Sequence, residues 1–246
     1  IGRTDLIKHK IVTTTDTPEA SRRFRYSPEQ QRVISEQLEK WDKQGIITKS
    51  NSNYAAPIVL VRKKDGTFRL CIDFRKLNAV TVRDVYPLPL IQELLDHLAG
   101  CSYFVLLDLK SAFLQIAMEP ESAHLTAFAT SNGLYQFNYM PFGLTNAVAT
   151  CQRLLDTVLQ GLQPHQCVVY LDDIMIKAKT FEELLVNLRA VLSRLIDAGL
   201  KVQPSKCQFL KSQFQYLGHT ISANGVQPSS SKTEAIVKLP PPKSAT

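Results

Sequence analysis

The distribution of apolar residues along the chain predicts four amphipathic helices. Within each, apolar side chains recur every three or four residues and therefore line one face. The first runs from Ser27, whose side chain can cap it with Gln30 completing a capping box, to Gly45. A second helix ends at Gly100, a third covers about 145–162, and a fourth covers 180–199. The residues expected to face the core are Val33, Ile34, Leu38 and Trp41 in the first helix, Leu90, Leu94, Leu95 and Leu98 in the second, and Cys151, Leu154, Leu155, Val158, Leu159 and Leu162 in the third.

Runs of β-branched and aromatic residues between turn signals predict the strands. Three dipeptides favour tight hairpin turns: Asp65-Gly66, Asn132-Gly133 and Asn224-Gly225. Outside these hairpins, the segments expected as strands are CSYFVLLDL (101–109), running out at Asp108, then Cys167–Leu171, Ile174–Lys177 and LKVQ (200–203).

The order of these elements between residues 101 and 203 indicates an α+β fold. If the 132–133 hairpin is an insertion, the order is strand, helix, strand, strand, helix, strand, the ferredoxin-like split βαβ arrangement of an antiparallel sheet. A right-handed crossover makes the first two strands parallel, so their carboxyl ends share one sheet edge. Asp108 ends the first strand, and Asp172-Asp173 form the turn that ends the second. The topology therefore brings three carboxylates together.

Three carboxylates at one edge repel one another and raise each other's pKa unless a cation lies between them. Oxygen ligands suit Mg²⁺, which retains water and is usually completed by substrate phosphates. Taken alone, Asp172-Asp173 is better explained as a solvated turn, because aspartate is common in turns. Because Asp108 is expected at the same sheet edge, a metal site becomes the better explanation for the three carboxylates.

Composition adds a moderately basic balance and room for a sizeable core. The chain has 246 residues, 44% of them hydrophobic, and a formal net charge of +7. This charge favours a polyanionic partner such as nucleic acid, although a basic protein without such a partner also fits. The five cysteines, an odd number with no Cys-x-x-Cys pair, give no zinc or disulfide pattern. No apolar run suits a membrane span. The first residue is not Met, so we expect a piece of a longer polypeptide.

Several long segments resemble reverse transcriptases in sequence and in order. The segment YLDDIMI resembles the Tyr-x-Asp-Asp hairpin of these enzymes, and YFVLLDLKSAFLQI resembles their first metal-binding motif. The MPFGL-x-NAPATFQ pattern of Ty3/gypsy-type retrotransposons and related retroviral Pol polyproteins resembles YQFNYMPFGLTNAVATCQRLLD. The flanking family segments are similar to RKKDGTFRLCIDFRKLNAVTVRDVYPLPLI and FQYLGHTIS. The resemblance covers about residues 25–240.

The resemblance implies an RNA-directed DNA polymerase that adds deoxynucleotides to a primer 3′-end with two Mg²⁺ ions, or Mn²⁺ as an alternative. Catalysis and metal binding are implied for Asp108, Asp172, the more loosely engaged Asp173 and the carbonyl of Leu109. The nucleotide is expected to contact Lys63 or Lys64, Arg69, Gln152 and Phe113, whose ring leaves no room for a sugar 2′-hydroxyl. The implied primer grip is Tyr216, Leu217, Gly218 and His219.

Each of these residues also has a plainer interpretation. Phe113 could pack in the core, the lysines could occupy a solvated hairpin tip, and Gln152 could be a polar helix position. Two residues depart from the family pattern: Val148 replaces the usual proline and Cys151 replaces the usual phenylalanine. They favour altered packing and leave open an alternative, a catalytically inactive nucleic-acid-binding remnant of the same fold.

The implied architecture is the fingers and palm of a right-hand polymerase. Its expected parts are an N-terminal arm, 1–26; a reverse transcriptase domain, 27–222, with fingers at about 27–90 and 119–145 and palm at about 91–118 and 146–222; and the end of the palm with the start of a truncated thumb, 223–246. The implied partners are an RNA template, a DNA primer or product and deoxynucleoside triphosphates. RNase H, integrase and protease domains are expected outside this chain, no membrane is implied, and the expected location is the cytoplasm within virus-like particles, with the nucleus as an alternative.

Overall fold

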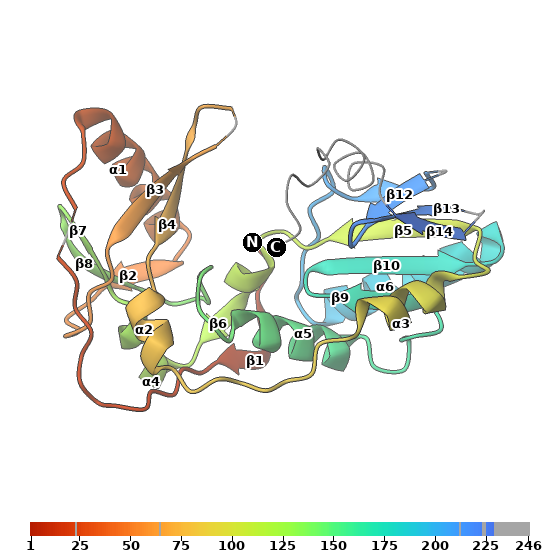
Figure 1. Ribbon diagram of the computed structural model, residues 1–246, viewed down its shortest axis with the longest axis horizontal. Coiled ribbons are helices and arrows are strands. Elements are labelled where there is room, and N and C mark those ends of the chain that lie inside the picture. Colours follow the sequence, from red (N-terminus) through yellow and green to blue (C-terminus); the bar gives the residue numbers. More distant parts are fainter. Residues whose placement is uncertain (23, 64, 212, 223–224, 229–246) are drawn as a thin grey trace, which may run out of the picture. The chain divides into compact units, whose positions relative to one another are not determined.

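The computed structural model describes residues 1–22, 24–63, 65–211, 213–222 and 225–228, in two compact units (Figure 1). Unit 1 comprises Ile1–Pro87, Lys110–Val158 and Leu195–Lys201. Unit 2 comprises Leu88–Leu109, Leu159–Arg194 and Val202–Thr246. These divisions cut through the predicted palm, because α5 (Ala147–Val158) and β6 (Ile116–Met118) belong to unit 1. The predicted domain boundaries stay predictions.

Unit 1 combines short helices with three small sheets. Its antiparallel strands are β2 (Ile47–Lys49), β8 (Gly133–Phe137) and β7 (Phe128–Thr130) in one sheet, and β3 (Ile58–Arg62) and β4 (Phe68–Ile72) in another. Its other elements include helices α1 (Pro28–Lys43), α2 (Arg75–Val80) and α4 (Pro120–Ala123), and 3₁₀-helices η1 (Ala112–Gln115) and η2 (His124–Thr126).

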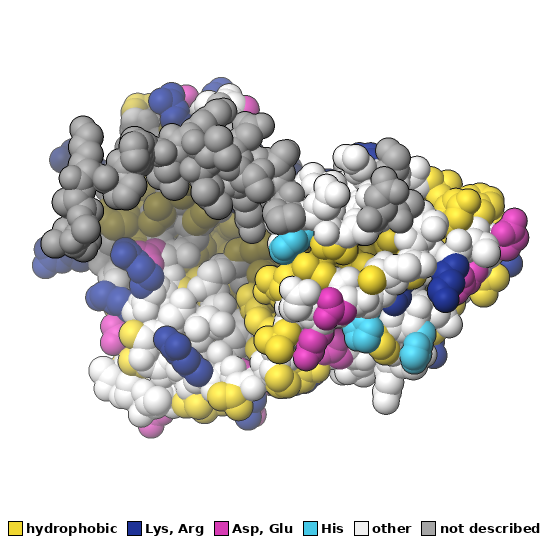
Figure 2. All heavy atoms as spheres, turned by 45° about the vertical axis from the view of Figure 1, so that its right-hand side comes forward, with side chains coloured by type: hydrophobic (Ala, Val, Ile, Leu, Met, Phe, Trp, Pro, Cys, Tyr) yellow, Lys and Arg dark blue, Asp and Glu magenta, His cyan; other side chains and the backbone are white. Residues whose placement is uncertain are grey.

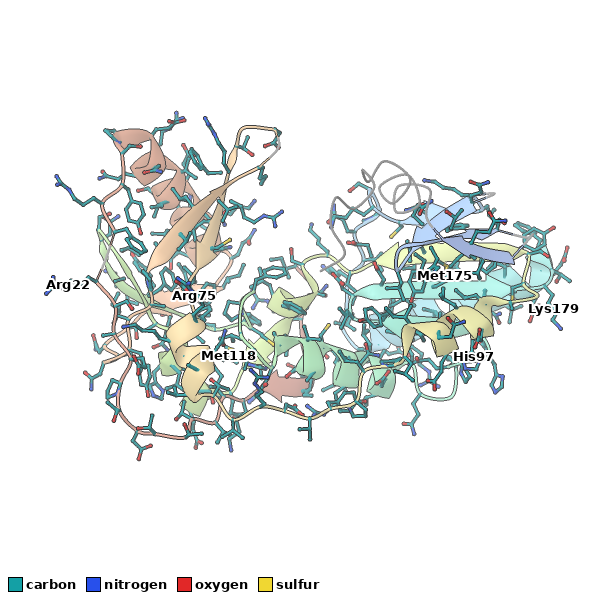
Figure 3. The ribbon with its side chains drawn as sticks, in the orientation of Figure 1. Arg22, Arg75, His97, Met118, Met175 and Lys179 are labelled. Atoms are coloured by element: carbon teal, nitrogen blue, oxygen red, sulfur yellow. The ribbon has the colours of Figure 1, made fainter. Side chains whose placement is uncertain are left out.

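Local chemistry sets the limits of these elements. The predicted capping box of α1 is confirmed: Ser27 Oγ accepts from Gln30 N at 3.3 Å, while Gln30 Oε1 accepts from Ser27 N at 2.9 Å. Ahead of α2, Asp73 accepts from the Arg75 backbone N–H and pairs with its guanidinium at 2.7 Å (Figure 3). These bonds satisfy amide groups that helix starts leave without intrahelical partners.

The N-terminal segment is extended, as expected, but its first residues are built into unit 1. Strand β1 (Thr4–His9) pairs in parallel with β6, and its end residues are almost fully buried. At Gly199, φ is +69°, and a Cβ would lie 2.1 Å from the Arg3 carbonyl oxygen. Glycine is therefore required where the chain entering β1 passes residue 199.

Unit 2 is organised around one antiparallel sheet. Its strand order is β11 (Gln208–Phe209), β5 (Tyr103–Asp108), β10 (Asp173–Ala178) and β9 (Cys167–Tyr170). Strands β5 and β9 are parallel to each other with β10 between them, which is the order of the ferredoxin-like arrangement. Beside it, β12 (Gln213–Tyr216), β13 (His219–Ser222) and β14 (Gly225–Pro228) form a second sheet.

Both faces of the main sheet are apolar. On one face, side chains of β5, β9 and β10, including Met175, pack against helix α3 (Ile91–Leu98) and against β12 and β13 (Figure 3). Lys177 of β10 donates from Nζ to the His97 carbonyl at the end of α3. The Lys177 carbonyl accepts from Asn187 of helix α6 (Phe181–Asp197) at 2.9 Å. Polar bonds thus connect β10 to both helices.

Several predicted elements differ from the observed ones. LKVQ is not a strand: Val202 makes one isolated bridge to Leu109, and β11 begins six residues later. Leu90 precedes α3 and is 65% exposed, so it does not face the core. The turn between β7 and β8 lies one residue earlier than predicted, since Thr130 pairs with Gly133. The 223–224 turn lies outside the described residues.

The six apolar residues predicted as the stripe of the third helix are all buried, but α5 ends at Val158, so Leu159 and Leu162 lie in the turns that follow it and not in the predicted helix. Within the described ranges, every helix is too short or too polar to cross a lipid bilayer.

Candidate active site

The acidic edge of unit 2 forms where β5 ends and the β9–β10 hairpin turns. Asp173 lies opposite Asp108 in the antiparallel register. Asp172 lies in the turn, and its carbonyl accepts from the Leu109 N–H at 3.4 Å. The expected meeting of these residues is therefore observed. It follows from a crossover that places β10 between two parallel strands.

The hairpin turn itself has an uncommon backbone. Leu171 adopts a φ of +59°, in the left-handed region that residues with a Cβ rarely occupy. The flanking residues of β9 and β10, Val169 and Ile174, have no exposed surface. The packed strands thus hold a strained turn in place, a feature that is frequent at functional sites.

The acidic edge has an excess of negative charge. Burial, together with the nearby charges of Asp172 and Asp108, raises the pKa of Asp173 to about 6, while Lys206 opposes the change. Asp108 Oδ1 is buried and has no hydrogen-bond partner among the described residues. Its second oxygen, Oδ2, lies 3.3 Å from Lys206 Nζ. One lysine therefore faces three carboxylates.

These carboxylates suit a divalent cation in their chemistry. They supply oxygen donors, one of them buried and unpartnered, and a nearby cation would relieve the cost of burying Asp173 in its charged form. In the described part of the chain, however, no three His, Cys, Asp or Glu side chains converge as a metal-binding group. The metal roles of Asp108, Asp172, Asp173 and the Leu109 carbonyl stay predictions.

The predicted primer grip lies at the β12–β13 turn of unit 2. Tyr216 is buried, and its hydroxyl has no hydrogen-bond partner. Burial raises the pKa of Tyr216, and the charge of Asp173 adds to this effect. Leu217 and Gly218 both have positive φ, at +49° and +78°, and His219 Nδ1 lies 3.2 Å from the Leu217 carbonyl. The turn is partly exposed, and its contact with a primer stays a prediction.

The other predicted residues belong to unit 1. Lys63 and Arg69 are exposed on the β3–β4 hairpin, where Lys63 N donates to the Thr67 carbonyl at 2.8 Å. Arg62 pairs with Phe68, so the connection spans five residues and not the tight two-residue turn expected at Asp65-Gly66. Lys64 lies outside the described residues, so the choice between Lys63 and Lys64 stays open.

Phe113 lies in η1 and is only partly buried, so it is not a simple core residue. Its ring centroid is 5.0 Å from that of Phe142, which is 59% exposed. The loop carrying Phe142 is fixed by Asn78, which donates to the Gly143 carbonyl at 2.8 Å and accepts from Thr145 N at 2.9 Å. Sequence reasoning missed Phe142, although it lies within the quoted MPFGL segment.

Gln152 has no exposed surface. Its Nε2 donates to Asp156 Oδ1 at 3.0 Å, while Asp156 Oδ2 accepts from the Tyr86 hydroxyl at 2.7 Å. In the observed conformation the Gln152 side chain is buried and bonded to Asp156, and its contact with an incoming nucleotide stays a prediction. The sequence offered no sign of the bond to Asp156 beyond the i, i+4 spacing of the two residues.

The family of the chain is settled by a match over most of its length. Residues 61–221 match the family described as "Reverse transcriptase (RNA-dependent DNA polymerase)". The chain belongs to this family. The match includes Asp108 and the Asp172-Asp173 turn, and the family predicted from the motifs is confirmed.

Curated relatives place this reverse transcriptase sequence among retroelement Pol polyproteins of the Ty3/gypsy type, as expected. It is 40% identical over 244 residues to the retrovirus-related Pol polyprotein from transposon 297 of Drosophila melanogaster, covering 97% of this chain and 23% of that protein. It is 32% identical over 222 residues to the transposon Tf2-3 polyprotein of Schizosaccharomyces pombe, covering 90% of this chain and 17% of that one. The chain thus spans about a quarter or less of these relatives' length.

Solved structures confirm the polymerase fold. The chain superposes on the foamy viral protease-reverse transcriptase in complex with an RNA/DNA hybrid with a TM-score of 0.87 and 25% identity, covering 98% of this chain and 32% of that one. The structure of that protein with double-stranded DNA gives a TM-score of 0.87, 25% identity and coverage of 98% and 50%. The predicted fold class is therefore confirmed.

Proposed function

We propose that this chain is the fingers and palm of an RNA-directed DNA polymerase that extends a primer with deoxynucleotides. The observation that carries the proposal is the register of β5 and β10, which sets Asp173 opposite Asp108 beside the Asp172 turn. Membership of the reverse transcriptase family, over residues that include this edge, supports the same conclusion.

In this proposal Asp108 and Asp172 hold two Mg²⁺ ions, with Asp173 and the Leu109 carbonyl as further oxygen donors. Bound Mg²⁺ would activate the attacking 3′-hydroxyl and stabilise the leaving pyrophosphate. The protein keeps its donors on packed strands and a strained turn, so they need little rearrangement to act. Phe113, held against Phe142, is proposed to contact the sugar and to exclude ribonucleotides.

The proposed partners are an RNA template, a DNA primer and deoxynucleoside triphosphates. The foamy viral structures named above contain an RNA/DNA hybrid or double-stranded DNA. The net charge of +7 favours a polyanion, and Figure 2 shows Lys and Arg side chains over the visible surface of unit 1. Contacts to the nucleic-acid backbone would give weak sequence preference.

The test is primer extension on an RNA template with deoxynucleotides and Mg²⁺. We expect extension by the wild type and a loss of at least about a hundredfold in Asp172→Asn, because an amide cannot replace a charged metal ligand. Asp96→Asn, at an exposed position on α3 of the same unit, is the matched control and should extend normally. Template binding without extension by the wild type would favour the inactive remnant.

A further inference from the structure

Residues 202–207 form a tight turn that is attached to the end of β5. Gln203 N donates to the Asp108 carbonyl at 2.7 Å, and Val202 forms an antiparallel bridge with Leu109. Beyond the turn, β11 pairs with β5. The backbone of this turn is therefore bonded directly to the strand that carries Asp108.

The turn also closes on itself, which fixes the position of Lys206. Lys206 N donates to the Gln203 carbonyl at 2.9 Å, and Cys207 N donates to the same carbonyl at 3.2 Å. Gln203 Nε2 donates to Ser205 Oγ at 2.9 Å. These bonds hold the backbone of Lys206 beside Asp108, so its side chain extends from a closed turn and not from a free loop.

The side chain of Lys206 points back to the acidic edge. Its Nζ lies 3.3 Å from Asp108 Oδ2, and the side chains are 66% and 18% exposed, respectively. Among the residues that can be described, Asp108, Asp172 and Asp173 form no other ion pair. In the described part of the chain, Lys206 is thus the basic group that contacts Asp108 directly.

An exposed ion pair usually adds little to stability, and this pair could be one of that kind. Two observations separate it from an ordinary surface contact. The other Asp108 oxygen is buried without a partner, and two further carboxylates lie at the same edge. Removing the lysine would leave the three carboxylates without a paired cation from the described residues.

We propose that Lys206 is the internal counter-ion of Asp108, which holds this carboxylate in the metal-free protein and competes with a divalent cation for it. The inference rests on the proposed function, because it takes Asp108 as a metal ligand. A cation that binds through Asp108 Oδ2 must displace the lysine or share the oxygen with it. Lys206 therefore weakens metal binding and stabilises the metal-free protein.

The inference is tested by titrating the metal-free chain with Mn²⁺ and following free Mn²⁺ by electron paramagnetic resonance. Lys206→Gln should bind Mn²⁺ roughly fivefold more tightly than the wild type, the effect of losing a competing ion pair of this exposure. Lys206→Arg keeps the charge and should bind like the wild type. Lys211→Gln, at an exposed position in the same unit, removes the same charge away from Asp108 and is the matched control.

Thermal unfolding gives a second, independent measurement. Without metal, Lys206→Gln should unfold at a lower temperature than Lys211→Gln, and saturating Mg²⁺ should raise its unfolding temperature more than that of the wild type. A Lys206→Gln variant that binds Mn²⁺ as Lys211→Gln does, or more weakly, overturns the inference.

The Asp172→Asn variant separates this failure from failure of the proposed function. Lost Mn²⁺ binding in Asp172→Asn, together with unchanged affinity in Lys206→Gln, rejects only the counter-ion role. Full Mn²⁺ binding by Asp172→Asn would reject the metal site, and the inference with it.

Discussion

The burial of His9 makes the stability of unit 1 depend on pH. His9 ends β1, is 1% exposed, and has Nδ1 2.8 Å from Thr150 Oγ1 of α5. Burial lowers its pKa from 6.5 to about 4, although the charge of Asp84 partly opposes this. The folded chain therefore keeps the imidazole neutral where the unfolded chain takes up a proton. The stability that depends on His9 is fully present above its pKa in the unfolded chain, 6.5, and is lost as the pH falls toward its pKa in the folded chain, about 4.

The two pKa values give the size of the effect. Their difference corresponds to about 3 kcal/mol once both states have titrated, and to roughly 2.5 kcal/mol at about pH 4.5. Replacing His9 with Gln removes this titration and keeps a side chain that can bond to Thr150. Relative to wild type, His9→Gln should therefore gain about 2.5 kcal/mol between about pH 7 and pH 4.5.

The assay is urea unfolding of the wild type and His9→Gln at several pH values. His165→Gln, which removes a histidine from an exposed position, is the control. Parallel pH profiles for the wild type and His9→Gln would refute the reasoning.

Three further outcomes are expected. Phe113→Ala should admit ribonucleotides in extension assays, and unchanged sugar discrimination would reject the role of this ring. Gly199→Ala should destabilise the chain by more than about 2 kcal/mol in urea unfolding, because a Cβ would meet the Arg3 carbonyl at 2.1 Å; a neutral effect would contradict this close approach. Arg153→Ala should cost about 1–2 kcal/mol by the same measurement, since its guanidinium is 2.8 Å from Asp84; full stability would show that this pair is dispensable.

The sequence was most informative where topology decides the outcome. One crossover and the apolar runs of the two strands were enough to predict that Asp108 lies beside Asp172 and Asp173, because strand direction fixes which ends meet. The position of β11 was not predictable in this way. Its two residues are partly or fully exposed, so no buried apolar pattern marks them, and their pairing with β5 is what places them.

Side-chain contacts between distant segments could not be read from spacing. Lys206 looks like any turn lysine until the turn is bonded to β5. The family resemblance implied a nucleotide contact for Gln152, but spacing gave no sign that this side chain is buried and bonded to Asp156. Leu90 continued the apolar pattern of α3 but precedes the helix, because its own backbone is extended, with φ of −71° and ψ of 131°. Such choices depend on packing partners that are far away in the sequence.

The central claim, template-directed synthesis of DNA, is tested most directly by single-nucleotide addition. A primed RNA template is supplied with Mg²⁺ and each deoxynucleoside triphosphate separately, and the lengthened primer and released pyrophosphate are measured together. The account predicts addition of only the nucleotide complementary to the next template base, with one pyrophosphate per addition. Addition that ignores the template, or none by a chain that binds the primed template, would contradict it.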